Sequence, residues 1–117
     1  MDQPIKADPQ LFKIILFNLV ENSLIFQNKE INKLHKIDVL ISKTDNQITL
    51  TITDNGIGIE EDQIDSIFDM FYRASAQSKG SGLGLYLVKI AVEKMKGSIQ
   101  VESIYEEYTS FTVNLPI

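Results

Sequence analysis

The first long apolar run of the chain has helical spacing. Over residues 8–27, apolar side chains occupy nearly the whole circumference of the expected helix, which predicts that this helix is heavily buried. Asp8 and Pro9 form a suitable start, because aspartate caps free backbone N–H groups and proline fits the first helical position. The chain therefore opens with a helix that needs cover on several sides.

The remaining apolar residues mark strands and two further helices. Residues 47–53 alternate between large apolar side chains and threonines, as a half-buried strand does. A short helix is expected from about Glu60, and a longer one over residues 83–95, which Gly97 is expected to end. The sequence predicts strands at residues 37–42, 47–53, 98–103 and 110–115, and a brief edge strand at residues 2–7.

Two asparagines interrupt the apolar surface of the first helix. Asn18 and Asn22 lie four residues apart and share one face. One such asparagine would usually be a satisfied polar group in the core, but two are costly to bury without partners. Amide oxygens are hard ligands that suit Mg²⁺ bound to phosphates. Glu21 points elsewhere and is interpreted as a solvated group.

Asp54 ends the alternating strand and is followed by Asn55, Gly56 and Gly58. Asn-Gly is a strong hairpin signal, but a helical pattern follows here instead of a partner strand. Glycine also permits close approach of a ligand. An aspartate at the end of a buried strand can accept a hydrogen bond from an exocyclic amine such as that of adenine.

Three glycines, Gly80, Gly82 and Gly84, lead into the helix at residues 83–95. Their spacing matches neither the dinucleotide fingerprint nor the P-loop. A flexible hinge and a phosphate-binding helix start are equally compatible with this local sequence. Residues 73–81 before the helix are small and polar, and we interpret them as a mobile loop.

Composition excludes several classes of protein. The 117 residues suit a single domain, with 44% hydrophobic residues and no cysteine to form disulfides or thiolate metal sites. The net charge of -5 disfavours nucleic acid or an anionic membrane as the main partner. No apolar run is long enough to span a membrane. His35 lies in a polar segment and is interpreted as exposed, and Phe68 and Phe71 as core residues.

Together these motifs resemble the ATP-binding catalytic domain of sensor histidine kinases, in the GHKL superfamily. The resemblance covers nearly the whole chain and keeps the family's order. Residues 18–22 look like the N box and residues 54–59 like the first glycine box. Residues 67–73 look like the F box and residues 80–85 like the second glycine box.

The resemblance implies an α+β fold, a two-layer Bergerat-type sandwich with a mixed sheet of about five strands and three helices on one face. It implies that the domain binds Mg-ATP and transfers the γ-phosphate to a histidine on a separate dimerisation domain. A response regulator would act downstream in this two-component system. It further implies a cytoplasmic domain without direct membrane contact, and leaves open whether the parent protein is membrane-anchored.

The resemblance also assigns roles within the site. Asn22 would coordinate Mg²⁺ beside Asn18, Asp54 would bind the adenine amine, and Arg73 would contact phosphate near a lid over residues 73–79. The other residues expected around the nucleotide are Gly56, Gly58, Ile59, Phe71, Lys79, Gly80, Gly82, Leu83, Gly84 and Leu85.

Two departures bear on the reaction. Ile25 stands where the family often has a phosphate-binding lysine, which keeps open a degenerate nucleotide-sensing or docking module. Asn18 stands where the related ATPases have a glutamate that activates water, which favours a kinase over an ATPase. The same asparagine counts against an anti-sigma-type serine kinase. With no plausible phosphoacceptor in the chain, we expect that it does not autophosphorylate alone.

Overall fold

The computed structural model describes residues 8–26, 34–70, 72 and 82–117. Their elements follow the order α1 (Pro9–Ile25), β1 (Ile37–Lys43), β2 (Gln47–Asp54), the 3₁₀ helix η1 (Glu61–Ser66), α2 (Gly84–Lys94), β3 (Ser98–Ile104) and β4 (Tyr108–Pro116). All four strands and all three helices that the sequence predicts in these ranges are present. The brief strand expected at residues 2–7 lies outside them.

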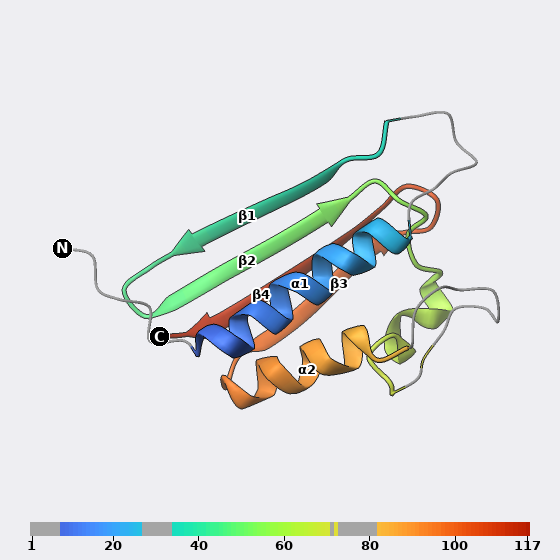
Figure 1. Cartoon of the computed structure of the whole chain (residues 1–117). Coiled ribbons are helices and arrows are strands. Elements are labelled where there is room, and N and C mark those ends of the chain that lie inside the picture. Colours follow the sequence, from blue (N-terminus) through green and yellow to red (C-terminus); the bar gives the residue numbers. More distant parts are fainter. Residues whose placement is uncertain (1–7, 27–33, 71, 73–81) are drawn as a thin grey trace.

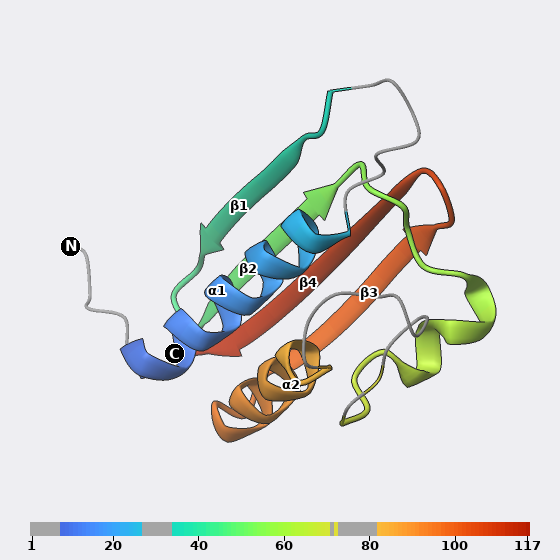
Figure 2. The same cartoon turned by 45° about the vertical axis from the view of Figure 1, so that its right-hand side comes forward.

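The strands form one sheet in the order β1-β2-β4-β3, and every neighbouring pair is antiparallel. Figures 1 and 2 show α1 and α2 side by side over one face of this sheet. The α+β sandwich is therefore confirmed, but the described residues contain an antiparallel sheet of four strands instead of a mixed sheet of five. Tight turns join β1 to β2 and β3 to β4, and such hairpins produce antiparallel pairs.

The core lies between the sheet and the two helices. β2 and β4 alternate, so that every second side chain faces the helices. Helix α1 adds Ile15 and Leu19, and α2 adds Val88, Ala91 and Val92. The sheet contributes the fully buried residues Ile48, Leu50, Ile52, Phe111, Val113 and Leu115.

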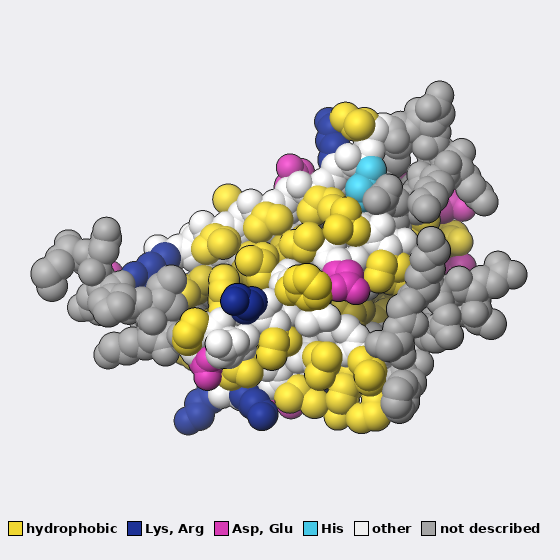
Figure 3. All heavy atoms as spheres, in the orientation of Figure 1, with side chains coloured by type: hydrophobic (Ala, Val, Ile, Leu, Met, Phe, Trp, Pro, Cys, Tyr) yellow, Lys and Arg dark blue, Asp and Glu magenta, His cyan; other side chains and the backbone are white. Residues whose placement is uncertain are grey.

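Helix α1 is less buried than its sequence predicts. Only Ile15, Leu19 and Ser23 are buried, whereas Phe17 is 63% exposed and Leu24 is 51% exposed. The space-filling view shows apolar side chains gathered on the surface of this face (Figure 3). A helix that lies on one sheet beside one other helix buries a single stripe, so the expectation of burial on all sides was wrong for the described residues.

Helix α2 ends differently from the prediction. Gly97 was expected as the helix stop, but Lys96 is the residue with a positive φ of 58°. The N–H of Gly97 donates to the carbonyl of Val92 at 2.9 Å, and that of Lys96 donates to the carbonyl of Glu93 at 3.0 Å. These two bonds form a Schellman motif, in which glycine usually holds the position that Lys96 occupies.

Candidate functional site

Asp54 is the buried charge at the end of β2. It continues the alternation of Ile48, Leu50 and Ile52, and therefore faces the helical layer with only 5% of its surface exposed. One carboxylate oxygen, Oδ2, accepts a hydrogen bond from the Ser23 hydroxyl at 2.9 Å, and Oδ1 accepts one from the backbone N–H of Gly56 at 2.8 Å. Burial raises the pKa of Asp54, although both hydrogen bonds act to lower it.

Ser23 is a site residue that the sequence analysis missed. Its side chain is fully buried and connects the last turns of α1 to the end of β2. The available signal was its position, four residues after Leu19 and eight after Ile15 on the buried stripe of α1. A small hydroxyl residue on such a stripe marks a position where the neighbouring element supplies a polar partner.

Asn18 lies on the side of α1 that borders the start of α2, and Asn22 follows it by about one helical turn. The Asn18 amide nitrogen donates to the carbonyl of Ile14 at 2.8 Å, which leaves its oxygen Oδ1 available. A Cβ added to Gly84 would lie 3.3 Å from this oxygen, so Asn18 borders the first residue of α2. Asn22 is half-buried, and its side chain makes no hydrogen bond to another described residue.

The glycines after Asp54 have a packing reason in the chain itself. A Cβ at Gly56 would overlap the carbonyl oxygen of Phe26, because the next residue, Ile57, donates its N–H to that oxygen at 3.0 Å. Gly58 has a φ of +72°, and a Cβ there would overlap the carbonyl oxygen of Ile104. The close approach that the sequence suggested is thus made by backbone, and ligand contact at these glycines stays a prediction.

Asn55 has a structural role that was not predicted, and His35 has surroundings that differ from the sequence-based interpretation. The Asn55 side chain accepts from the N–H of Lys36 at 2.8 Å and donates to the carbonyl of Leu34 at 2.9 Å. It therefore fixes the segment before β1 and makes no hairpin turn. His35 is half-buried, not exposed, and its Nε2 is buried without a hydrogen-bond partner among the described residues.

A hydroxyl network holds the end of the glycine loop. The N–H of Ile59 donates to Ser103 Oγ at 2.8 Å, and Ser103 Oγ lies 3.0 Å from Thr109 Oγ1. Thr109 is buried and lies directly across from Asp54 in the β2–β4 register. Neither Ser103 nor Thr109 was predicted as a site residue, because their contact depends on the register of β3 with β4.

The second glycine segment begins α2 at Gly84, one residue later than predicted. Gly82 has a φ of +78°, a conformation that glycine adopts without strain. Leu83 is the N-cap residue and makes no side-chain capping bond. Leu85 packs against the core. The backbone N–H groups at a helix N-terminus suit an anion.

These elements bring several predicted site residues to one end of the molecule, near the end of β2. Asp54 contacts Ser23 of α1, the Asp54–Ile59 loop follows it, and Asn18 borders the start of α2. The predicted nucleotide contacts Phe71, Arg73, Lys79 and Gly80 lie outside the described residues.

The residues present fit Mg²⁺ bound with a nucleotide better than a protein-only metal site. No group of three or more His, Cys, Asp or Glu in the described ranges could hold a metal ion. Mg²⁺ usually keeps several waters and takes one or two protein ligands beside phosphate. The half-buried Asn22 amide, which makes no hydrogen bond to another side chain or backbone group in the described ranges, can supply one such oxygen.

No helix in the described part of the chain is long and apolar enough to cross a membrane.

Comparisons with known proteins agree with this arrangement. The model of the family described as "Histidine kinase-, DNA gyrase B-, and HSP90-like ATPase" matches residues 7–117. The chain is 35% identical to the sensor protein EvgS of Escherichia coli O157:H7, covering 97% of this chain and 10% of EvgS. It is 36% identical to the sensor protein CiaH of Streptococcus pneumoniae serotype 4, covering 97% of this chain and 26% of CiaH.

A solved structure extends the similarity to the fold. The mycobacterial sensor histidine kinase MprB superposes with a TM-score of 0.79 at 28% sequence identity, covering 96% of this chain and 76% of that one. By contrast, the chain spans only about a tenth of EvgS and a quarter of CiaH. It therefore corresponds to one part of these longer sensor proteins.

Proposed function

The chain belongs to the family of histidine kinase-, DNA gyrase B- and HSP90-like ATPases, as the ATP-binding domain of a sensor histidine kinase, and on this premise we propose that it is the catalytic domain of its parent protein. It binds Mg-ATP and donates the γ-phosphate to a histidine on a separate dimerisation domain. A response regulator receives the phosphoryl group afterwards. Residues 1–117 act as one cytoplasmic domain in this scheme.

The observation that carries the proposal is the buried carboxylate of Asp54. Each of its oxygens already accepts one hydrogen bond, from Ser23 and from Gly56. An ionised carboxylate offers about four lone-pair positions, so it can also accept from the exocyclic amine of adenine. Because Ser23 and Gly56 hold both oxygens, the carboxylate is oriented before the nucleotide arrives.

The phosphates would lie between α1 and the start of α2. The N-terminus of α2 carries a partial positive charge, and the side chain of its N-cap residue, Leu83, makes no capping hydrogen bond. Gly82 and Gly84 allow oxygen atoms to approach the backbone, and the Asn22 amide oxygen would complete the shell of a Mg²⁺ ion on the phosphates. Mg²⁺ would neutralise charge that develops as phosphate is transferred.

The side chains near this position favour transfer to histidine over hydrolysis. Asn18, next to Gly84, cannot take a proton from water, whereas neutral imidazole is a nucleophile that needs no strong base. As a bond forms from an imidazole nitrogen to the γ-phosphorus, the bond from phosphorus to the bridging oxygen breaks and ADP leaves. The protein's part is to hold the nucleotide in position.

One observation supports a second candidate, a nucleotide-sensing or docking module without activity. Ile25 is half-buried at the end of α1, where the resemblance places a phosphate-binding lysine. Without that cation the nucleotide would bind more weakly. A module of this kind would bind partners but transfer no phosphate.

Radiolabelled ATP separates these functions. The chain is incubated with Mg²⁺ and γ-labelled ATP, alone and with the histidine-bearing domain of its parent protein supplied as a separate polypeptide. The proposal predicts acid-labile label on the histidine domain and none on the isolated chain. Stable label on the isolated chain, or no label on the histidine domain despite nucleotide binding, would contradict it.

A further inference from the structure

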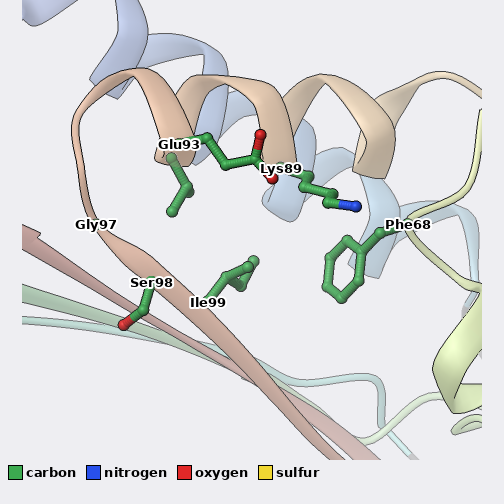
Figure 4. A pocket seen from close by; sticks show the side chains of 7 residues that line it. Phe68, Lys89, Glu93, Gly97, Ser98 and Ile99 are labelled. Carbon is green, nitrogen blue, oxygen red and sulfur yellow. The ribbon is translucent and has the colours of Figure 1, made fainter.

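A pocket lies along the middle and C-terminal part of α2, away from the proposed nucleotide site at the start of this helix. It has a volume of about 280 Å³ and opens between the C-terminal half of α2, the start of β3 and Phe68 (Figure 4). None of the residues expected to bind nucleotide lines it. Its lining consists of Phe68, Lys89, Val92, Glu93, Gly97, Ser98 and Ile99.

The floor of this pocket is apolar and firmly held. Phe68 packs edge-on against the buried ring of Phe111, with centroids 6.2 Å apart and planes at 75°. Val92 is 2% exposed, and Ile99 packs against the core from β3. A pocket of this volume with an apolar floor suits one large apolar side chain better than a nucleotide, because pockets that bind small molecules are usually larger.

Two opposite charges stand at the rim. Lys89 and Glu93 are both exposed, and Figure 4 shows Lys89 reaching toward Phe68 while Glu93 lies nearer the end of α2. No ion pair or side-chain hydrogen bond joins either of them to another described residue. Lysine four residues before glutamate is also the less favourable order on a helix. The rim therefore offers a positive and a negative group to a ligand.

The third wall of the pocket is the edge of the sheet. β3 pairs only with β4 within the described residues, so its other side carries backbone groups without a strand partner. Near Ser103 and Ile104 the loop with Gly58 and Ile59 lies against β3. The start of the edge, at Ser98 and Ile99, adjoins the pocket instead. Such an edge is a template for an added strand.

We propose that this groove binds an extended segment of a partner protein, which adds to β3 as an antiparallel strand and inserts one large apolar side chain between Phe68, Val92 and Ile99. Antiparallel pairing is favoured because it is the more stable arrangement. The added strand then runs from the Phe68 end toward the Gly97 end. Every second side chain of this strand faces α2. Counted from the N-terminus of the strand, these side chains are acidic, large apolar and basic, so that they contact Lys89, the apolar floor and Glu93 respectively.

Synthetic peptides test this proposal on the intact chain. The acetylated and amidated peptide TETFTKT follows the proposed order of charges, and TKTFTET reverses it. In a ¹⁵N-labelled protein we expect TETFTKT to shift the amide signals of residues 97–101 and to bind about fivefold more tightly than TKTFTET, from two exposed charge pairs. Equal affinities, a preference for TKTFTET, or shifts centred on Asp54 and Gly56 would contradict the proposal.

A charge-exchange variant gives a sharper control. Lys89→Glu combined with Glu93→Lys keeps both side chains exposed and gives the favourable order on the helix. It should invert the peptide preference, whereas Lys94→Glu, at an exposed position outside the pocket, should keep it. If the exchanged variant kept the same peptide preference, Lys89 and Glu93 would not contact the charged residues of the peptide, and the proposed charge order would be wrong.

A third peptide separates strand addition from simple filling of the pocket. TETFTKT with N-methyl groups on the threonines beside its phenylalanine keeps every side chain but loses backbone donors. Binding should fall below detection if the peptide pairs with β3. Undiminished binding would mean that the pocket takes a side chain without strand addition, and the proposal would fail.

Discussion

The hydroxyl of Ser23 donates a 2.9 Å hydrogen bond to Oδ2 of Asp54, across 31 residues of sequence. This bond joins the buried stripe of α1 to the end of β2, and it holds one of the two oxygens of the only carboxylate that is buried in the described residues. The position of a predicted adenine contact therefore depends on a residue of α1.

Ser23→Ala should therefore weaken both the fold and the site. The substitution leaves a buried carboxylate oxygen with one donor fewer, which costs about 1–3 kcal/mol of the free energy of unfolding. The pKa of Asp54 should rise further, because the Ser23 hydrogen bond acts to lower it. Urea denaturation measures the first effect and carbon NMR titration of the Asp54 carboxyl measures the second.

The matched control is Ser42→Ala, at an exposed position of β1. This variant should unfold within about 0.5 kcal/mol of the unmodified chain, as surface substitutions usually do. If Ser23→Ala were equally mild, the hydrogen bond to Asp54 would contribute little to stability.

Asp54→Asn should change how stability depends on pH. Burial raises the pKa of Asp54 in the folded chain above the ordinary value of 3.8. The folded state then binds the proton more tightly than the unfolded state. The resulting stabilisation is complete below the ordinary pKa and is lost as the pH rises through the folded pKa.

An asparagine carries no such proton, so Asp54→Asn should lose this decline. Its amide can accept from Gly56 and donate to the Ser23 hydroxyl, which preserves both contacts. Denaturation between about pH 3 and pH 7 compares the two chains. Relative to the variant, the unmodified chain should lose stability as the pH rises, and parallel profiles would contradict the assignment of the raised pKa.

Much of the fold followed from spacing along the chain. The alternation of Ile48, Leu50 and Ile52 identified β2, and it also placed Asp54 on the buried face. The four motifs identified the family because their order and spacing are set by a shared fold. The spacing of apolar residues was sufficient to predict those helices and strands whose structure depends on their own side chains.

The missing parts depend on contacts between distant segments. Ser23 can be assigned a role only once its contact with Asp54 is known. Glycine is needed at position 58 because the carbonyl oxygen of Ile104 lies where a Cβ would stand. The exposure of α1 depends on what covers its outer flank, which its own residues do not specify. The sequence could locate polar and glycine residues, but their partners were visible only in three dimensions.

Substitutions at two glycines should distinguish a glycine that is needed for packing from one that is needed for ligand binding. Gly58→Ala forces a positive φ on alanine and an overlap with the carbonyl of Ile104, so it should cost about 2 kcal/mol or more without any nucleotide. Gly84→Ala gains helix propensity and meets only Asn18 Oδ1 at 3.3 Å. Its stability should change by no more than about 1 kcal/mol.

The affinity of Gly84→Ala for Mg-ATP should nevertheless fall about tenfold, because a Cβ would obstruct approach of phosphate to the backbone. Calorimetric titration measures the affinity and thermal unfolding measures the stability. A Gly84→Ala variant that binds Mg-ATP normally would show that this glycine serves the contact with Asn18 alone.

At the end of α2, a lysine-to-glycine substitution should have opposite effects on stability at two positions that lie two residues apart. Lys96 has a φ of 58°, which costs a side-chain-bearing residue about 1 kcal/mol, so Lys96→Gly should stabilise the chain by about that amount. Lys94→Gly lies within the helix and should destabilise it by about 1 kcal/mol. Loss of stability in both variants, measured by urea denaturation, would refute the strain at Lys96.

The most direct test of the central claim is a calorimetric titration of the chain with Mg-ATP and Mg-GTP, repeated with Asp54→Asn. An adenine amine donating to Asp54 predicts that ATP binds at least about tenfold more tightly than GTP, whose base carries a carbonyl oxygen at that position. Asp54→Asn should abolish this preference while the chain remains folded. Equal affinity for ATP and GTP, or a preference unchanged by Asp54→Asn, would contradict the assignment of Asp54 and the site built around it.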